Sequence, residues 1–195
     1  MSAPIYITRH GQTDWNAEQR VQGQAETDIN ALGRRQAKAN GQKLAQLVPD
    51  PSGFAFVASP MRRTRETMEI IRAEMGLPRD GYVVDPRLVE VHFGAWQGST
   101  FAELERRNPG TTAGRDGDKW LFRPPGQAAE SYAMLADRIR PWFESLTGPA
   151  IIVTHGGVIR TLFHIANGLA GNDAANMDVP QDRVLRVADG KVRWI

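Results

Sequence analysis

The sequence contains no cysteine, and this absence excludes several kinds of protein and site. A chain without thiols forms no disulfide bonds, so the small secreted scaffolds that depend on disulfides are excluded. Thiolate metal sites and a cysteine nucleophile are excluded for the same reason. The absence is typical of a protein in a reducing compartment, and we expect the chain to be cytoplasmic.

Long apolar runs and an excess of one charge are absent as well. No stretch approaches the roughly 20 residues that a membrane-spanning helix requires. The first residues, Met1-Ser2-Ala3-Pro4, lack the basic and apolar regions of a secretion signal. Because 24 Lys and Arg face 22 Asp and Glu, the net charge is +2. We therefore expect neither a membrane nor a nucleic acid as partner.

Short apolar runs alternate with helical patterns along the chain. This alternation predicts an α/β fold with three layers, α/β/α, around a mostly parallel sheet. The expected strands are residues 5–8, 54–58, 82–84 and 150–154. Asp189-Gly190 suits a tight hairpin within residues 183–195, which predicts an antiparallel pair whose second strand lies at a sheet edge. The length of 195 residues predicts a single domain over residues 1–195.

Two features interrupt this regular pattern. A helical pattern over residues 130–146 contains Pro141, which predicts a kink or a split into two helices. Residues 99–129 are rich in Gly and Pro, and a segment of that length without regular structure is usually functional or disordered. There we expect a short helix and an irregular loop that form a lid or insert and shape the choice of substrate.

Polar residues follow three of the expected strands at the point where each strand ends. Arg9-His10-Gly11 follows the first strand, Arg63 lies just after the second, and His155-Gly156-Gly157 follows the fourth. The carboxyl ends of parallel strands meet at one sheet edge, where open α/β folds bind ligands. Cations gathered there repel one another unless an anion lies among them. Glycine also lets backbone N–H groups approach an anion closely, so the pattern predicts an anion pocket.

A single carboxylate, Glu90, lies among apolar and aromatic neighbours in residues 88–98. Partial burial by Phe93 and Trp96, next to a bound phosphate, would keep Glu90 protonated and make it a general acid. Each residue also has an ordinary explanation: Glu90 fits a solvated turn, and His10 and His155 fit hydrogen-bonded core positions. The functional interpretation is favoured because suitable residue types end three strands at once.

Five motifs occur in order along the chain. They are Thr8-Arg9-His10-Gly11-Gln12-Thr13-x-Trp15-Asn16, Gln22-Gly23, Ser59-Pro60-Met61-x-Arg63-Thr64-x-x-Thr67, Glu90-x-x-Phe93-Gly94-x-Trp96 and His155-Gly156-Gly157. Together they resemble the histidine phosphatase superfamily, the cofactor-dependent phosphoglycerate mutase branch included. The resemblance covers residues 5 to 168.

The resemblance implies a role for each matching residue. His10 would be a nucleophile that becomes a phosphohistidine, and Glu90 the proton donor. Arg9, Arg63 and His155 would surround the phosphoryl group. The family's contacts to phosphate or substrate fall on Asn16, Gln22, Gly23 and the backbone of Gly156. We expect no metal, because the sequence has no His-x-x-x-His or clustered Asp pattern, and no cofactor.

These roles imply a phosphomonoester phosphatase, a hydrolase that acts on a small phosphorylated metabolite. One alternative is a phosphoglycerate mutase with 2,3-bisphosphoglycerate as cofactor. His92 and Gln97 look mutase-like, whereas Trp96, the short insert and the lack of an Asn-Lys pair after Gly98 favour a phosphatase. Another alternative is a non-catalytic module that binds phosphoryl ligands, which would have no use for the acid Glu90. The sequence is compatible with a homodimer.

Overall fold

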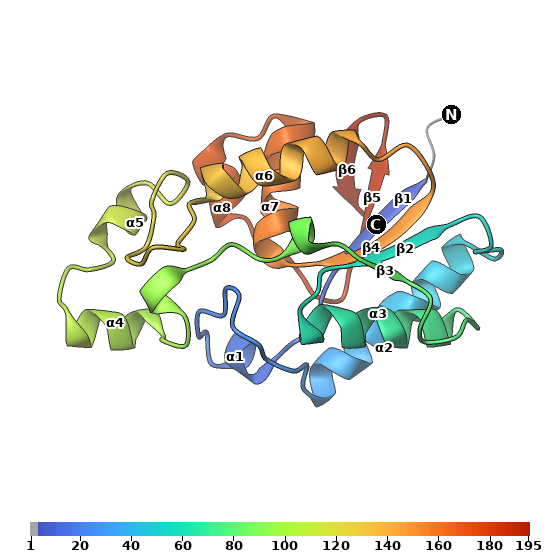
Figure 1. Cartoon of the computed structure of the whole chain (residues 1–195), viewed down its shortest axis with the longest axis horizontal. Helices are drawn as coiled ribbons and strands as arrows, with labels where there is room; N and C mark the ends of the chain where they lie inside the picture. The colour runs from blue at the N-terminus through green and yellow to red at the C-terminus, as the bar shows by residue number, and fades with distance from the viewer. Residues whose placement is uncertain (1–3) are drawn as a thin grey trace.

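The computed structural model describes residues 4–195, and its centre is a six-stranded sheet (Figure 1). The strands are β1 (Ile5–Arg9), β2 (Ala55–Ala58), β3 (Val83–Val84), β4 (Ala150–Thr154), β5 (Val184–Ala188) and β6 (Lys191–Trp194), and their order in the sheet is β3-β2-β4-β1-β5-β6. β1, β2, β3 and β4 run parallel, whereas β5 is antiparallel to both β1 and β6. The predicted mostly parallel sheet with an antiparallel edge strand is confirmed.

Helices cover both faces of this sheet, which confirms the predicted three-layer α/β/α fold (Figure 1). Helices α2 (Ala31–Leu47) and α3 (Arg62–Glu74) lie on one face, and α6 (Tyr132–Glu144), α7 (Gly156–Asn167) and α8 (Gly171–Asn176) lie on the other. The remaining helical segments are α1 (Asp14–Ala17), α4 (Phe101–Arg107), α5 (Ala113–Gly117) and the 3₁₀ turns η1 (Pro86–Leu88) and η2 (Gly94–Trp96).

The alternation of side chains along the central strands explains why both faces are covered. Ile5 and Ile7 of β1 pack into the core formed with α6 and α7, whereas Tyr6 between them packs into the core formed with α2 and α3. Ile152 and Ile151 of β4 divide in the same way. Successive side chains of a strand point to opposite faces, so strands that are apolar throughout need a helical layer on each side.

The predicted split of the helix at Pro141 is wrong. α6 runs from Tyr132 to Glu144 without a break and contains Pro141. Proline has no N–H group, so the carbonyl of Asp137, four residues earlier, loses its helical donor. Asp137 is an exposed residue, so the loss falls on the solvent side of the helix, where an unpaired carbonyl costs little. At the other end, the side chain of Ser131 accepts a hydrogen bond from the N–H of Met134 and begins the helix.

Residues 99–129 contain two short helices, α4 and α5, where the sequence predicted one. α4 begins at a capping box: Thr100 Oγ1 accepts from the N–H of Glu103 at 3.1 Å, and Glu103 Oε2 accepts from the N–H of Thr100 at 2.9 Å. Figure 1 shows this segment beyond one end of the sheet. Among the helices of residues 4–195, none combines the length and apolar character needed to cross a membrane.

Two glycines bring the end of β1 against the start of α2. The backbones of Gly11 and Gly33 lie so close that a Cβ atom on either residue would overlap the other backbone. The N–H of Gly11 also donates to Thr67 Oγ1 of α3 at 3.1 Å. The turn that follows β1 is therefore held by both helices of one layer.

We expect Gly33→Ala to lower the free energy of unfolding by about 1–3 kcal/mol, the usual cost of overpacking. Urea or thermal unfolding measures this change. Gly53→Ala is the matched control, because a Cβ atom at Gly53 meets no other atom within 4 Å. Equal stabilities of the two variants would contradict the close contact between Gly11 and Gly33.

Candidate active site

The segments that follow β1, β2 and β4 meet around one cavity, as the sequence predicted. The cavity has a volume of about 220 Å³. The predicted site residues that line it are Arg9, His10, Asn16, Gln22, Gly23, Arg63 and Glu90. His155 and Gly156 do not line it. The ring of His155 is fully buried with its centroid 5.3 Å from that of His10, and Gly156 lies against the side chain of Arg9.

His10 directly follows β1 and is almost completely buried. Its Nδ1 lies 2.8 Å from the carbonyl oxygen of Gly11, so Nδ1 carries the proton and donates to this oxygen, and Nε2 keeps its lone pair. Burial lowers the pKa of His10 well below its ordinary value, and the cations Arg63 and Arg9 lower it further. His10 is therefore neutral at pH 7, with an Nε2 that can act as a nucleophile.

Backbone carbonyls hold both outer nitrogens of the cation Arg63 and one outer nitrogen of the cation Arg9. Nη1 and Nη2 of Arg63 donate to the carbonyls of Ala25 and Gly23 at 2.8 and 2.7 Å. Nη1 of Arg9 donates to the carbonyl of Val179 at 2.8 Å. Burial lowers the pKa of both guanidinium groups, that of Arg9 to about 10, so both stay charged at neutral pH.

Three buried nitrogens of this group find no hydrogen-bond partner within residues 4–195: Arg9 Nε, Arg63 Nε and His155 Nδ1. The other ring nitrogen of His155, Nε2, lies 2.7 Å from Ser59 Oγ. Burial is the main cause that lowers the pKa of His155 well below its ordinary value, so its ring is neutral. These three atoms are closed to solvent, so a ligand in the cavity does not contact them directly. An anion bound in the cavity would still offset the repulsion between the two guanidinium groups.

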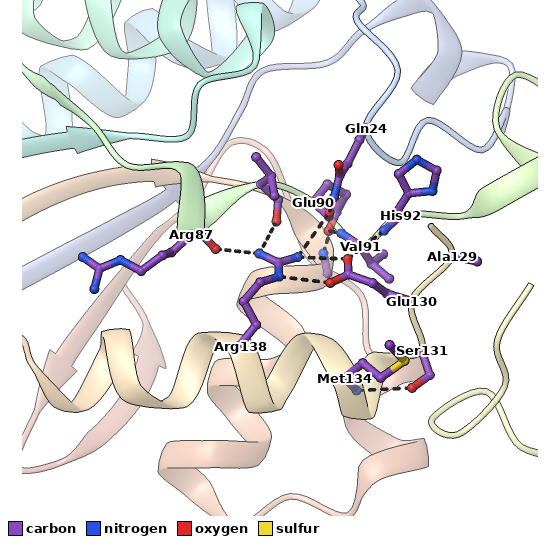
Figure 2. A network of polar contacts seen from close by, with 12 residues as sticks. Gln24, Arg87, Glu90, Val91, His92, Ala129, Glu130, Ser131, Met134 and Arg138 are labelled. Atoms are coloured by element: carbon purple, nitrogen blue, oxygen red, sulfur yellow. Dashed lines mark hydrogen bonds and ion pairs between the residues drawn. The ribbon is translucent and has the colours of Figure 1, made fainter. Parts of the chain in front are cut away.

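Glu90 lies between η1 and η2, and two backbone N–H groups fix its carboxyl group (Figure 2). Oε1 accepts from the N–H of Val91 at 2.9 Å, and Oε2 accepts from the N–H of Gly157 in the first turn of α7 at 3.1 Å. A Cβ atom at position 157 would overlap Oε1, so glycine is required for this approach. Among the described residues that line the cavity, Glu90 is the single carboxylate.

Asn16 and Gln22 present amide groups to the cavity. Asn16 Oδ1 accepts from the N–H of Thr13 at 3.1 Å and from Gln181 Nε2 at 3.0 Å, and Gln22 Oε1 accepts from Thr27 Oγ1 at 2.8 Å. These bonds use the amide oxygens and orient both side chains. No hydrogen bond within residues 4–195 uses the two amide nitrogens, so both are available as donors to a ligand.

The two mutase-like positions hold loop backbone and do not line the cavity. His92 Nδ1 accepts from the N–H of Gly94 at 2.9 Å, and Gln97 Oε1 accepts from the N–H of Gln24 at 2.8 Å. Neither residue is part of the cavity wall. Neither residue is therefore placed to contact a ligand in this cavity.

Sequence reasoning missed the outer wall of the cavity, which consists mainly of cationic and aromatic side chains. The missed residues are Gln19, Arg20, Val21, Phe93, Phe101, Arg115, Lys119, Tyr132 and Arg160. Arg160 lies one helical turn after Gly156, so helical spacing from that glycine indicates it. Arg115 and Lys119 carry no signal beyond their position in the expected lid. In the part of the chain that the structure describes, no group of three or more His, Asp or Glu is placed to hold a metal ion.

Comparison with known proteins agrees with this geometry. The model of the histidine phosphatase superfamily (branch 1) matches residues 5–193. The glucosyl-3-phosphoglycerate phosphatase of Mycolicibacterium vanbaalenii is 36% identical over 178 residues, which are 85% of this chain and 74% of that protein. The metal-independent phosphoserine phosphatase of Arabidopsis thaliana is 32% identical over 164 residues, which are 82% of this chain and 66% of that protein.

A solved structure has the same fold. The mycobacterial glucosyl-3-phosphoglycerate phosphatase in complex with VO3 is 28% identical and has a TM-score of 0.79, and the match covers 100% of this chain and 97% of that chain. The family model spans nearly the whole sequence, and both relatives named above are phosphatases. This chain therefore belongs to the histidine phosphatase superfamily, as a phosphatase of its first branch.

Proposed function

We propose that the chain hydrolyses small phosphomonoesters through a phosphohistidine intermediate on His10, without a metal ion or cofactor. The observation that carries this proposal is that His10, the cations Arg9 and Arg63 and the single carboxylate Glu90 line one cavity. A phosphoryl group bound there would offset the charge of the two guanidinium groups. The ring of His10 is neutral and its Nε2 is unprotonated, so a nucleophile lies in the same cavity as these cations.

The first step transfers the phosphoryl group to His10. The Nε2 lone pair attacks phosphorus in line, and the bond from phosphorus to the leaving oxygen breaks. Arg9 and Arg63 hold the non-bridging oxygens as charge develops on them. Glu90 donates its proton to the leaving oxygen, which departs as an alcohol. The carbonyl of Gly11, which accepts from Nδ1, stabilises the positive charge that forms on the ring.

The second step transfers the phosphoryl group to water. Glu90, now a carboxylate, takes a proton from a water molecule, and the water oxygen attacks phosphorus. The P–N bond breaks, inorganic phosphate leaves, and His10 recovers its lone pair. Glu90 is protonated again, so the enzyme returns to its starting state.

The charge of the cavity wall indicates the class of substrate. The cations that line it are Arg9, Arg20, Arg63, Arg115, Lys119 and Arg160, and the single carboxylate is Glu90. Burial, together with the nearby cations Arg160 and Arg115, lowers the pKa of Lys119 to about 8. Asp116, whose charge raises the pKa of Lys119, pairs with Arg115 at 2.9 Å. Lys119 therefore lies beside cations whose charge the protein does not fully balance.

A second anionic group on the substrate would offset this excess of positive charge. We therefore assign as substrate a small metabolite that carries a carboxylate or a second phosphate near its phosphoester. The relatives named as phosphatases of glucosyl-3-phosphoglycerate and of phosphoserine act, by those names, on compounds of this class. Their names support the assignment.

The His10→Ala variant tests the nucleophile. We expect turnover of p-nitrophenyl phosphate in EDTA to fall to about 1% of wild type or less, because the attacking atom is lost. The matched control is His164→Gln, which alters a histidine outside the cavity whose Nδ1 lies 2.8 Å from the carbonyl of Leu169. A folded His10→Ala protein that kept more than roughly 5% of turnover would remove His10 from this role. Failure of the wild type to hydrolyse any phosphomonoester would refute the enzyme assignment.

The Lys119→Met variant tests the second anionic group. 3-Phosphoglycerate carries a carboxylate where glycerol 3-phosphate has a hydroxymethyl group, and 2,3-bisphosphoglycerate keeps that carboxylate and adds a second phosphate. We expect kcat/KM to fall about tenfold for the two more acidic substrates, or about 1.4 kcal/mol, and to change little for glycerol 3-phosphate. Lys38→Met, which changes an exposed lysine of α2, is the control. An equal loss for all three substrates would contradict the assignment.

The pH dependence follows from the lowered pKa of Lys119, about 8. Lys119 is charged below this pKa and neutral above it, whereas both substrates keep a constant charge above pH 7.5. We expect the preference for 3-phosphoglycerate over glycerol 3-phosphate, as a ratio of kcat/KM values, to decrease as the pH rises through about 8. A constant ratio between pH 7.5 and 9.5 would show that Lys119 does not bind the second anion.

A further inference from the structure

Glu90 is carried by backbone that belongs to no helix or strand. Residues 89–93 lie between the 3₁₀ turns η1 and η2 and form no ladder with the sheet. A side chain that must reach a reacting atom is placed only as accurately as the backbone that bears it. Some other part of the molecule therefore has to fix this segment.

Arg138 of α6 binds this segment from below in the view of Figure 2. Its Nη1 donates to the carbonyl of Arg87 at 2.6 Å and to that of Val89 at 3.1 Å. Its Nη2 lies 3.5 Å from the carbonyl oxygen of Glu90 itself, which also accepts from Gln24 Nε2 at 2.9 Å. One guanidinium group thus contacts three carbonyls at and just before Glu90.

Glu130 orients Arg138 and binds the other side of the same segment. Nε and Nη2 of Arg138 each donate to one carboxylate oxygen of Glu130 at 3.0 Å, which is the bidentate geometry of a strong pair. Glu130 Oε2 also accepts from the N–H of His92 at 3.0 Å, and the N–H of Glu130 donates to the carbonyl of His92 at 2.8 Å. The two side chains are 24% and 18% exposed, so solvent screens the pair only in part.

We propose that Arg138, oriented by Glu130, is a positioning residue for the proton transfer by Glu90; this inference rests on the acid role of Glu90 in the proposed function. Arg138 fixes the backbone from position 87 to 90, and Glu130 fixes position 92. At the end of the Glu90 side chain, Oε2 accepts from the N–H of Gly157 in α7, and α7 packs beside α6. Two neighbouring helices thereby determine both the backbone and the carboxyl group of the acid.

A comparison of two leaving groups tests this role. p-Nitrophenolate departs without a proton, whereas the alkoxide of glycerol 3-phosphate requires one. For Arg138→Met we expect kcat to fall about tenfold or more with glycerol 3-phosphate and less than about threefold with p-nitrophenyl phosphate, because a displaced acid slows the step that needs it. Arg140→Met, which changes an exposed arginine of the same helix, is the matched control and should leave both rates unchanged.

Glu130→Gln provides a second variant should Arg138→Met fail to fold. Glutamine keeps the shape of the side chain and removes the charge that orients Arg138, so we expect the same dependence on the leaving group. A purely structural role for the pair would instead lower stability and slow both substrates equally. Equal slowing in the folded variants would overturn the proposal.

Glu90→Gln separates this inference from the proposed function. If Glu90→Gln slows both substrates equally, the acid role of Glu90 is wrong. If Glu90→Gln slows glycerol 3-phosphate selectively while Arg138→Met does not, the acid role stands and the positioning role is wrong.

We expect Arg138→Met to add little to the loss in a Glu90→Gln background, because both changes act on one proton transfer. A full additional tenfold loss there would also overturn the positioning role.

Discussion

Repulsion between cations that share a small volume is the constraint on which the arrangement of this site depends. Arg9 and Arg63 lie beside two histidines at one edge of the sheet, and Arg160 adds to the repulsion at Arg9. Backbone carbonyls bind both outer nitrogens of Arg63 and one outer nitrogen of Arg9, and burial keeps both histidine rings neutral. The charge that remains on the two guanidinium groups is the charge that a phosphoryl group would offset.

The histidines and Glu90 are held in place by different parts of the fold. His10 and His155 directly follow the central strands β1 and β4, so the sheet itself determines their positions. Glu90 lies on irregular backbone, and its position depends on hydrogen bonds from side chains of α6 and from the first turn of α7. The proposed nucleophile thus directly follows a central strand, whereas the proposed acid is held by polar side chains and backbone N–H groups. This difference is the reason that we assign a positioning role to Arg138 and Glu130.

Much of the fold and of the inner site could be predicted from the sequence, because local patterns encode them. Apolar runs that end on Arg9-His10 and on His155 indicate strands and their carboxyl ends, and parallel strands bring those ends together. The outer wall could not be predicted, because no local pattern indicates where the short helix α5, with Arg115, and the residues after it, with Lys119, lie relative to the sheet. The role of Arg138 and Glu130 could not be predicted for a similar reason. In the sequence Arg138 resembles an ordinary surface residue of a helix, and its contacts with the carbonyls of Arg87 and Val89 are seen only in the structure. The split predicted at Pro141 was wrong because the effect of a proline in a helix depends on whether the carbonyl that loses its donor is exposed.

The proposed function requires that the phosphoryl group binds covalently to His10 during each turnover. Trapping this phosphohistidine tests the function most directly. The enzyme is mixed with a ³²P-labelled phosphomonoester, quenched in alkali within the first turnover, digested, and the labelled peptide identified. The account predicts label on the peptide that contains His10, stable in alkali and lost in acid as a P–N bond requires, and none in His10→Ala. Turnover without any protein-bound label, or label on a different residue, would contradict it.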